Sequence, residues 1–315
     1  MGAFVNGTWR EGDFPHDTTG RFVRPDSPFR NWITANGEPG PSGVGGFKAE
    51  PERYHLIISL ACPWAHRALI FRRLKGLESM ISLSVVHWLL GERGWTFDPG
   101  PGVIPDPIFG ASAIREFYVK ARPDYSGRVT VPVLWDKKTN TIVNNESSEI
   151  IRMFNSAFDG VGGAEGDYYP AGLRPEIDEV NDRIYRTVNN GVYRAGFATS
   201  QEAYEEAFRE LFETLDWLEA RLAGQRFLIG QRLTEADWRL FTTLIRFDPV
   251  YFGHFKCNLR EIRNYSALSR YLKELYHLPG VAETVDFFHI KHHYYESHRR
   301  INPTGIVPLG PEMAL

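Results

Sequence analysis

The sequence predicts a two-domain protein in which an α/β domain is followed by an all-α domain. Three observations support this fold class. The chain has 315 residues, which is long for one domain and comfortable for two. Between residues 51 and 160, short apolar runs typical of strands alternate with helical patterns. From residue 172 to residue 301, apolar residues recur at helical spacing almost throughout.

The α/β domain begins with a strand, a helix and a second strand. Arg53–Leu60 (RYHLIISL) is an apolar run that ends at small residues, which is typical of a buried strand. Pro63–Leu77 has apolar residues at helical spacing, and Pro63 suits a first helical turn. Ile81–Val86 follows as a strand. Cys62 therefore lies at a strand-to-helix junction.

A long insertion, residues 89–120, then interrupts the pattern with a segment rich in Gly and Pro. Two further strands, Val129–Asp136 and Thr141–Asn145, are predicted to form a hairpin, and Glu146–Phe158 is predicted to be a helix. The order of the first domain is thus β-α-β followed by β-β-α.

The remaining segments connect or flank these domains. Residues 1–50 are rich in Gly, Pro, Asp and Asn and predict an irregular arm, and residues 302–315 predict a coil tail. A Gly-rich linker, Asp159–Ala171, precedes the helical domain. Within that domain, Thr234 and Asp237 are spaced as a capping-box-like start of the apolar run Trp238–Phe247.

Composition limits the class of protein. With 43% hydrophobic and 24% charged residues, the chain is expected to fold around a buried core. Its net charge of −3 provides no basic surplus for nucleic acid or anionic lipid. We find no signal peptide and no apolar run of about 20 residues, so no membrane partner is expected. Two cysteines are too few for a disulfide framework and favour the cytoplasm.

Cys62 is the predicted nucleophile. A helix N-terminus stabilises a thiolate through free N–H groups and the macrodipole, and such sites lower a Cys pKa from ~8.5 to between about 3.5 and 7.5. Arg67, one turn later, adds positive charge if it points toward the thiol. An arbitrary cysteine is more often a small buried hydrophobe, but the position before Pro63 reverses those odds.

The chemistry predicted for Cys62 uses one thiol from the protein. Cys62-Pro63-Trp64-Ala65 has the outline of a redox CPxC motif in which Ala65 replaces the second cysteine, so an external thiol must resolve a mixed disulfide. Cys257 lies far along the chain and is expected to be structural.

Two short motifs suggest how a peptide-like thiol is bound. Thr130-Val131-Pro132-Val133 has the form of a cis-proline site beside a thiol, which leaves backbone groups free to pair with an extended ligand. Glu146-Ser147, at a predicted helix start, suits the ammonium and carboxylate of an amino-acid-like ligand end. An ordinary N-cap is an equally good interpretation of Glu146-Ser147.

A histidine cluster near the C-terminus raises the question of a metal. His289 and His293 are four residues apart on a predicted helix, with His292 and His298 nearby. No His-Glu-x-x-His pattern or neighbouring Cys accompanies them, so no metal is predicted.

With these residues in place, the chain resembles the glutathionyl-hydroquinone reductases, the Xi class of the glutathione transferase superfamily. Eight blocks spread over nearly the whole chain carry the resemblance: Pro28–Ile33 (PFRNWI), Ala61–Arg67 (ACPWAHR), Gly94–Phe97 (GWTF), Tyr125–Asp136 (YSGRVTVPVLWD), Asn145–Phe154 (NESSEIIRMF), Asn189–Thr199 (NNGVYRAGFAT), Phe247–Cys257 (FDPVYFGHFKC) and Asn302–Ile306 (NPTGI). The segment Leu89–Lys120 is the divergent one.

The resemblance implies the glutathione transferase fold, with a thioredoxin-like N-terminal domain and an all-helical C-terminal domain. It implies that Cys62 attacks the sulfur of a glutathionyl-hydroquinone, giving an enzyme–glutathione mixed disulfide and free hydroquinone. A second glutathione then releases oxidised glutathione. Glutathione is therefore the expected co-substrate, without a metal.

Carried over position by position, the resemblance assigns a glutathione site to Trp95, Arg128, the Val133 backbone, Glu146 and Ser147. It assigns the hydroquinone oxygens to two phenols, Tyr193 and Tyr294, for which core packing is the structural alternative. A homodimer assembled through the helical domains is also implied.

Two other functions stay open from the residues alone. One is a broader Cys-type thiol transferase that reduces mixed disulfides or dehydroascorbate. The other is a non-catalytic scaffold, since a fold by itself does not determine function. The reducing thiol is also open, because some bacteria use a small thiol other than glutathione, whereas Glu146 and Ser147 are expected to recognise only a glutathione-like end.

Overall fold

The computed structural model describes residues 2–12 and 14–315 of the chain. They form two compact units, which we describe separately. The first comprises Met1–Asp13, Asp26–Gly166 and Thr284–His293, and the second comprises Phe14–Pro25, Asp167–Glu283 and Tyr294–Leu315.

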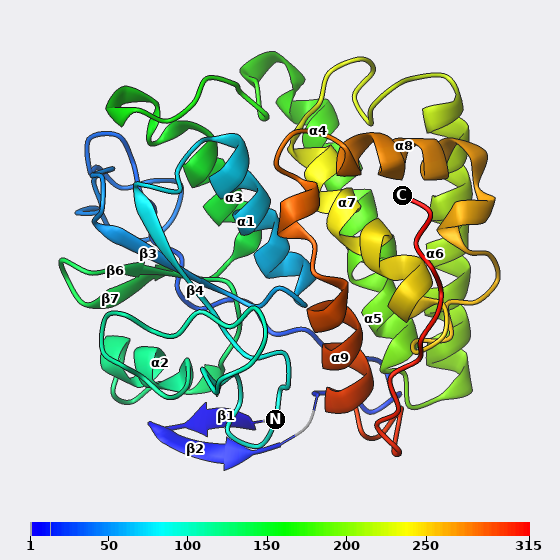
Figure 1. Ribbon diagram of the computed structural model, residues 1–315, viewed down its shortest axis with the longest axis horizontal. Coiled ribbons are helices and arrows are strands. Elements are labelled where there is room, and N and C mark those ends of the chain that lie inside the picture. The colour runs from blue at the N-terminus through cyan, green and yellow to red at the C-terminus, as the bar shows by residue number, and fades with distance from the viewer. Residues whose placement is uncertain (1, 13) are drawn as a thin grey trace. The chain divides into compact units, whose positions relative to one another are not determined.

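A four-stranded mixed sheet forms the centre of the first unit. Its strands, in the order β4-β3-β6-β7, are Ile81–Val85, Tyr54–Ile58, Val133–Asp136 and Thr141–Asn144. β3 pairs in parallel with β4 and antiparallel with β6, and every residue of β3 is buried, as expected for a central strand. The helices α1 (Pro63–Leu74) and α3 (Ser147–Ser156) pack together on one face, while α2 (Arg115–Ala121) lies on the other (Figure 1).

This arrangement confirms the predicted α/β fold class, with small shifts at element ends. Helix α1 stops at Leu74 rather than Leu77. The reason is Gly76, whose φ of +60° is left-handed and cannot continue a helix. The predicted helix Glu146–Phe158 is also shorter. It begins at Ser147, because Glu146 is the N-cap of α3 and precedes the first helical residue.

The prediction of an irregular arm was wrong for its first residues. Strands β1 (Gly2–Val5) and β2 (Thr8–Glu11) form an antiparallel hairpin, and β1 also pairs with the short strand β5 (Gly127–Arg128). The turn is Asn6-Gly7, and both residues have positive φ, 48° and 73°. An Asn-Gly pair is the strongest short hairpin signal, so the sequence contained this information.

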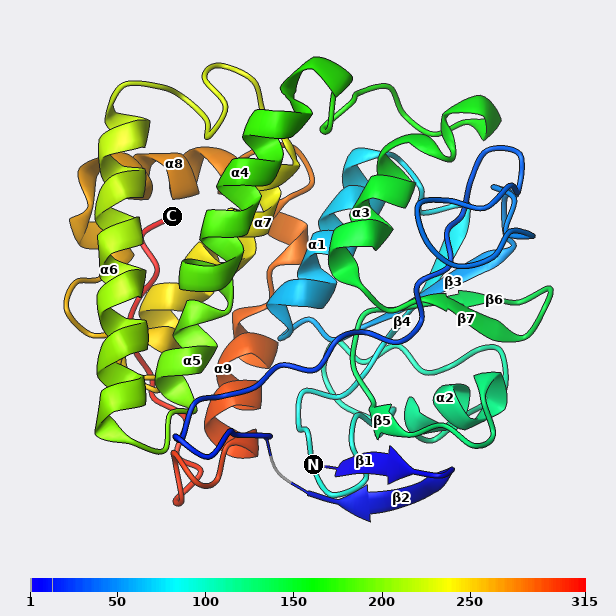
Figure 2. The same cartoon turned by 180° about the vertical axis from the view of Figure 1, so that it is seen from behind.

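The second unit is helical, which confirms the predicted all-α domain. Its helices and turns are η2 (Ala171–Leu173), α4 (Arg174–Ile184), η3 (Tyr185–Asn189), α5 (Gly191–Gly196), α6 (Gln201–Ala223), α7 (Glu235–Arg246), η4 (Phe247–Tyr251), η5 (Ile262–Asn264) and α8 (Ser266–Tyr276). The turns η1 (Asp159–Val161) and η6 (Ala282–Thr284) lie outside this set, and helix α9 (Phe287–Ser297) begins in the first unit and ends in the second. Figure 2 shows α4 and α5 running alongside the long helix α6.

Helix α7 starts at the predicted capping box. The hydroxyl of Thr234 bonds to the N3 backbone, and the Asp237 carboxylate accepts a hydrogen bond from the Thr234 N–H at 2.8 Å. This box lies in the core, where it supplies partners for helix-end groups that water cannot reach.

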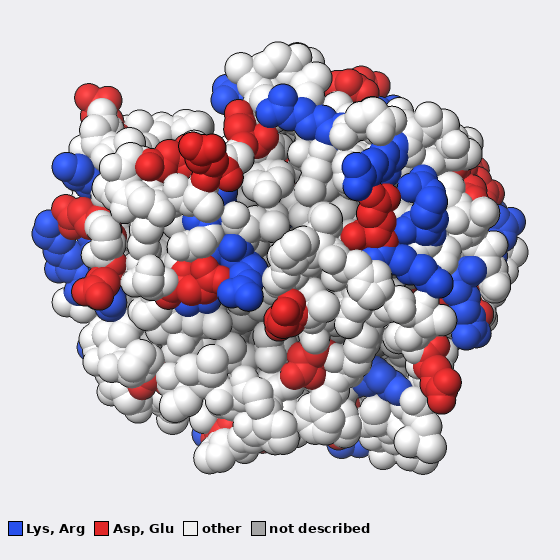
Figure 3. Space-filling view, turned by 45° about the horizontal axis from the view of Figure 1, so that its top comes forward, with Lys and Arg blue, Asp and Glu red and all other residues white. Residues whose placement is uncertain are grey.

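Acidic and basic side chains are interspersed on the face shown in Figure 3, in keeping with the small net charge. Across the described residues, none of the helices is both long and apolar enough to cross a membrane.

Candidate active site

Cys62 is the N-cap residue of α1, as its position before Pro63 predicted. Its φ of −77° and ψ of 120° are extended, so the chain leaves the sheet and turns into the helix at this residue. The thiol is half-buried, and the first turn that follows it is Pro63-Trp64-Ala65-His66, which has no negative charge. No carboxylate in that turn therefore opposes the positive end of the α1 dipole, although no N–H of the helix start is hydrogen-bonded to the sulfur.

A backbone carbonyl also faces the thiol. The Val131–Pro132 peptide bond is cis, as the motif predicted, and the S–H of Cys62 points to the Val131 carbonyl oxygen at 3.7 Å. Val133, the residue assigned from the resemblance, begins β6 and lies opposite Ile57 of β3. Val131, which touches the thiol, and Val133, whose backbone was assigned to glutathione, belong to the same motif.

Arg67 connects α1 to α3 inside the first unit. Its side chain is buried, with the guanidinium carbon 4.6 Å from the centre of the Trp64 ring. One terminal nitrogen lies 3.5 Å from the Ser147 hydroxyl, at the limit of a hydrogen bond. The positive charge expected beside the thiol is therefore directed toward the start of α3.

Glu146 is the N-cap of α3, which is one of the two roles that the sequence predicted for it. One carboxylate oxygen accepts hydrogen bonds from the Ser148 N–H at 3.0 Å and the Ser148 hydroxyl at 2.9 Å, and the other accepts from Ser27 at 3.2 Å. Burial alone raises the pKa of Glu146, but these hydrogen bonds and the Arg67 charge outweigh it and hold the pKa below its ordinary value. Glu146 is thus a carboxylate at neutral pH, with Ser147 buried beside it.

The two other residues assigned to glutathione lie elsewhere in the first unit. Trp95, in the insertion, is buried and stacks on His293 with ring centres 4.9 Å apart. Arg128 is in β5, half-buried, and pairs with Ala3 of the hairpin. Glu146 and Ser147 therefore lie at the start of α3, which packs against α1 and which Arg67 of α1 reaches, whereas Arg128 belongs to the small sheet β2-β1-β5.

In the second unit, the two assigned tyrosines meet through their hydroxyls. The Tyr193 and Tyr294 oxygens are 2.5 Å apart, and Tyr294 is also 2.9 Å from the hydroxyl of Tyr251. The three residues come from α5, α9 and η4 and form a phenol chain in which Tyr294 is central. Core packing alone does not require such a chain of hydroxyls, because phenylalanine fills the same space.

Tyr251 is a residue that sequence reasoning missed. It lies in the block Phe247–Cys257 that carried the resemblance, but nothing in its spacing separates it from the other tyrosines. Burial raises the pKa of both Tyr251 and Tyr294 well above the ordinary value, so both are protonated hydrogen-bond donors over the physiological range.

The C-terminal histidines have backbone and side-chain partners. A ring nitrogen of His289 lies 2.6 Å from the Pro101 carbonyl, and one of His293 lies 2.8 Å from the Trp88 carbonyl. His298 shares a hydrogen bond with His254 at 3.1 Å. Among residues 2–12 and 14–315, His, Cys, Asp and Glu side chains form no group of three that is arranged to hold a metal ion.

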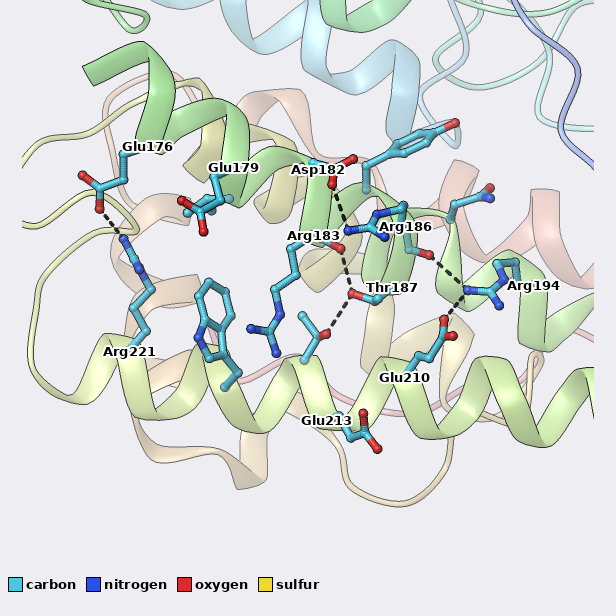
Figure 4. Close-up of a pocket in the computed structure, with 15 residues that line it drawn as sticks. Glu176, Glu179, Asp182, Arg183, Arg186, Thr187, Arg194, Glu210, Glu213 and Arg221 are labelled. Carbon is cyan, nitrogen blue, oxygen red and sulfur yellow. Dashed lines mark hydrogen bonds and ion pairs between the residues drawn. The ribbon is translucent and has the colours of Figure 1, made fainter. Parts of the chain in front are cut away.

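A groove of about 970 Å³ lies in the second unit between α4, η3 and α6 (Figure 4). Ion pairs cross it, including Arg221 with Glu176 at 2.6 Å and Arg194 with Glu210 at 2.5 Å. Arg183 stacks on Trp217 with 4.1 Å between the guanidinium carbon and the ring centre. Its walls carry both signs of charge and no thiol, so we do not assign thiol chemistry to it.

Comparison with known families matches both halves of the chain. The family "Glutathione S-transferase, N-terminal domain" matches residues 61–157, and "Glutathione S-transferase, C-terminal domain" matches residues 201–274.

Full-length relatives are also similar. The chain is 58% identical to glutathionyl-hydroquinone reductase YqjG of Escherichia coli K12, over 99% of this chain and 95% of the relative. It is 57% identical to glutathionyl-hydroquinone reductase PcpF of Sphingobium chlorophenolicum, over 100% of this chain and 98% of the relative.

Solved structures agree in fold. The glutathione-bound structure of Escherichia coli YqjG superposes with a TM-score of 0.93 at 56% identity, over 99% of this chain and 96% of that one. A Xi class glutathione transferase from Natrialba magadii superposes with a TM-score of 0.90 at 48% identity, over 99% and 94% of the two chains. The protein therefore has the glutathione transferase fold, and it belongs to the glutathionyl-hydroquinone reductases, the Xi class of that superfamily.

Proposed function

We propose that this enzyme reduces glutathionyl-hydroquinones to hydroquinones with glutathione as the reductant, through a mixed disulfide on Cys62. The observation that carries this proposal is a half-buried cysteine at the N-terminus of α1, with Ala65 where a resolving cysteine would stand. Two relatives of similar length named glutathionyl-hydroquinone reductase support it.

The proposed reaction balances with two glutathiones. The Cys62 thiolate attacks the glutathione sulfur of the substrate, so that an S–S bond forms and the bond from sulfur to the ring carbon breaks. The electron pair of the broken bond stays with the ring, which takes up a proton and leaves as hydroquinone. A second glutathione attacks the mixed disulfide as its thiolate and regenerates the Cys62 thiolate. The ring is reduced, and two glutathiones become one oxidised glutathione.

Glutathione is held, in this proposal, by Trp95, Arg128, the Val133 backbone, Glu146 and Ser147. A carboxylate at Glu146 binds the ligand ammonium, and the Ser147 hydroxyl with the N–H groups of the α3 start binds its α-carboxylate. The lowered pKa of Glu146 supports this role, because the side chain must be ionised to bind a cation.

Tyr193 and Tyr294 are proposed to serve the leaving ring. An aromatic carbanion is a poor leaving group, whereas the keto tautomer of the ring leaves as an enolate whose charge is on oxygen. Phenols that hydrogen-bond the ring oxygens stabilise this charge and return a proton to it. The hydroxyl contact between Tyr193 and Tyr294 supports assigning both to one task.

We further propose a cytoplasmic homodimer that associates through the helical domains, with domain limits at residues 51–160 and 172–301. The small number of cysteines supports a reducing compartment.

Light scattering during gel filtration measures the oligomeric state directly, and a monomer at micromolar concentration would contradict the dimer.

The decisive experiment traps the intermediate. Wild-type enzyme mixed with a glutathionyl-hydroquinone, without free glutathione, should release one hydroquinone per active site and gain one glutathione on Cys62 by mass spectrometry. Cys62→Ser should do neither, while Cys257→Ala should do both, because burial raises the pKa of the Cys257 thiol and leaves it unreactive. Normal turnover by Cys62→Ser would falsify the mechanism. A faster rate on a simple mixed disulfide would favour a general thiol transferase.

A further inference from the structure

Part of the N-terminal arm belongs to the helical unit and is bound along α5. A ring nitrogen of His16 lies 2.7 Å from the Phe197 carbonyl, at the C-terminal end of α5. The Thr199 N–H donates to the Gly20 carbonyl at 3.0 Å, and Arg21 forms an ion pair of 2.6 Å with Glu206 of α6. The segment Phe14–Pro25 therefore has a defined position on this unit.

The arm also reaches the N-terminal end of α5, and it does so through Arg24. The Nε–H of Arg24 donates to the side-chain oxygen of Asn190 at 2.8 Å. Asn190 is three residues before Tyr193, so the two side chains lie on the same face of α5. The Arg24 guanidinium carbon is 4.9 Å from the centre of the Tyr193 ring, within the range of a cation–π interaction.

Tyr193 differs from the two other members of the phenol chain in having the Arg24 guanidinium on its ring and in being more exposed. Tyr294 and Tyr251 are 1% and 0% exposed, whereas Tyr193 is 9% exposed. A second cation, Arg246, is buried, donates to the Thr242 carbonyl and acts electrostatically on Tyr251 and Tyr294.

Two histidines and one more arginine of this unit also lie near the phenol chain. His254 and His298 pack near Tyr294, with ring centres 6.3 and 5.4 Å from it. Arg194, the residue after Tyr193, forms ion pairs with Glu210 and Glu206 of α6, at the groove of Figure 4. Arg24 differs from these groups in that its guanidinium lies on the Tyr193 ring.

We propose that Arg24 is a positioning residue that makes Tyr193, rather than Tyr251 or Tyr294, the proton donor to the departing hydroquinone. This inference rests on the proposed function. When Tyr193 gives its O–H proton to the ring oxygen, the negative charge moves to the Tyr193 phenolate. That charge is shared with the aromatic ring, where the Arg24 guanidinium stabilises it, and the Tyr294 hydroxyl donates a hydrogen bond to its oxygen. Solvent then returns the proton to Tyr193.

The test removes the charge of Arg24 and keeps its hydrogen bond. Arg24→Gln retains an N–H donor for Asn190, Arg24→Lys retains the charge, and Arg21→Gln is the matched control on the same segment. Tyrosine ionisation is followed by ultraviolet absorbance and by carbon NMR of labelled tyrosine, with the Tyr193 signal assigned from its loss in Tyr193→Phe. We expect Arg24→Gln to raise the midpoint for Tyr193 by about one pH unit, and Arg24→Lys to raise it by less.

The same variants are then compared in turnover. Arg24→Gln should lower kcat about fivefold and move the alkaline limb of the pH profile by the same amount as the Tyr193 midpoint, with KM for glutathione unchanged. Arg21→Gln should leave the ionisation midpoint of Tyr193, the alkaline limb of the pH profile and kcat unchanged. An equal midpoint in wild type, Arg24→Gln and Arg21→Gln would overturn the inference.

The titration separates this inference from the proposed function, because it requires no substrate. If the wild type does not release hydroquinone, the proposed function fails, and the Tyr193 midpoint still shows whether Arg24 acts on this phenol. If wild type and Tyr193→Phe turn over equally, the role of Tyr193 as donor is overturned whatever the titration shows.

Discussion

The thiol region and the phenol region of this enzyme are built from different kinds of interaction. In the thiol region, which comprises Cys62, α1 and the start of α3, the groups carry formal or partial charges, namely the start of α1, the Arg67 guanidinium and the Glu146 carboxylate. The phenol region is a chain of neutral hydroxyls, Tyr193, Tyr294 and Tyr251. The difference follows from the chemistry proposed for each region. A thiolate must remain an anion and needs positive potential, whereas phenols must remain protonated in order to donate.

The two units also differ in the partners of a buried carboxylate. Asp136 of the first unit is paired with Arg53, at 2.6 Å, and both side chains are almost fully buried. Asp237 of the second unit accepts hydrogen bonds from the Leu228 and Thr234 N–H groups and from two hydroxyls. The Asp136 charge is thus balanced by a buried guanidinium, whereas Asp237 has only hydrogen-bond donors, and burial raises its pKa. Four variants test these contrasts.

Tyr294→Phe should give the largest effect, a loss in kcat of about 10³-fold with little change in KM for glutathione. Tyr294 is central in the phenol chain, so its loss leaves Tyr193 and Tyr251 without their shared partner. Tyr295→Phe is the matched control, because the hydroxyl of Tyr295 makes a long contact of 3.4 Å with the Pro249 carbonyl and lies outside the phenol chain. Equal rates for the two variants in single-turnover release of hydroquinone would show that the phenol chain has no part in the chemistry.

Asp136→Asn should lower the free energy of unfolding by about 3 to 4 kcal/mol in urea denaturation, because it leaves the Arg53 charge buried without its partner. Burial raises the pKa of Asp136, but hydrogen bonds from Arg53, Thr139 and the Lys138 N–H outweigh it and hold the pKa below its ordinary value. The stability from this carboxylate is therefore present above the unfolded pKa of about 4 and is lost as the pH falls through the folded pKa.

The control for Asp136→Asn is Asp98→Asn. Asp98 pairs with Arg93, but both side chains are about half exposed, so water already solvates the charges. Its removal should change the free energy of unfolding by less than about 1 kcal/mol. If the two substitutions lower the free energy of unfolding equally, the buried ion pair does not stabilise the fold more than the exposed one does.

Asp237 should contribute to stability at low pH, whereas Asp136 contributes at high pH, and Asp237→Asn should remove this contribution. Burial raises the pKa of Asp237 to about 6, so folding takes up a proton between about pH 4 and pH 6. The stability from this group is fully present below about pH 4 and is lost as the pH rises through 6, a loss of up to about 3 kcal/mol.

Asparagine does not titrate, so this slope should vanish in Asp237→Asn when unfolding is measured across that pH range. The variant should also be less stable at every pH, because its amide NH2 faces backbone N–H donors from Leu228 or Thr234. An unchanged slope would assign the pH dependence to another group.

Glu146→Gln should have the smallest of these effects, weakening glutathione binding about ten- to a hundredfold. Calorimetric titration in the Cys62→Ser background measures binding without reaction. Glu149→Gln is the control in the same helix, because the Glu149 carboxylate pairs with Arg30 instead. Equal affinities of the two variants for glutathione would show that Glu146 does not bind it. A fall in kcat with unchanged affinity would show that Glu146 acts in the chemical step, which would contradict the contrast between the thiol region and the phenol region.

Much of the thiol region was predictable because its parts are neighbours in the sequence. The strand before Cys62, Pro63 after it and the Val131–Pro132 motif are local patterns, and each has the predicted form. The direction of Arg67 was not predictable, since a helical side chain points to either neighbour depending on what packs there. The hairpin at Asn6-Gly7 carried a local signal that the composition of the arm obscured.

The phenol region was predictable only in part. The resemblance selected Tyr193 and Tyr294, but Tyr251 and Arg24 join them from η4 and from the arm. These residues are separated by tens to hundreds of positions, and no periodicity relates an arm residue to a helix so far away. The assignment of Phe14–Pro25 to the helical unit likewise required coordinates.

By itself, the sequence determined the fold classes of the two domains, the order of the main strands and helices after residue 50, and the placement of Cys62 at a helix start. These depend on patterns within about 20 residues, where chain connectivity already limits the geometry. The tertiary structure alone decided that Arg67 faces Ser147, that three phenols share hydrogen bonds, and that Arg24 covers one of their rings. The physical reason is that hydrogen bonds and cation–π contacts have a range of a few ångströms, so they depend on where distant segments pack.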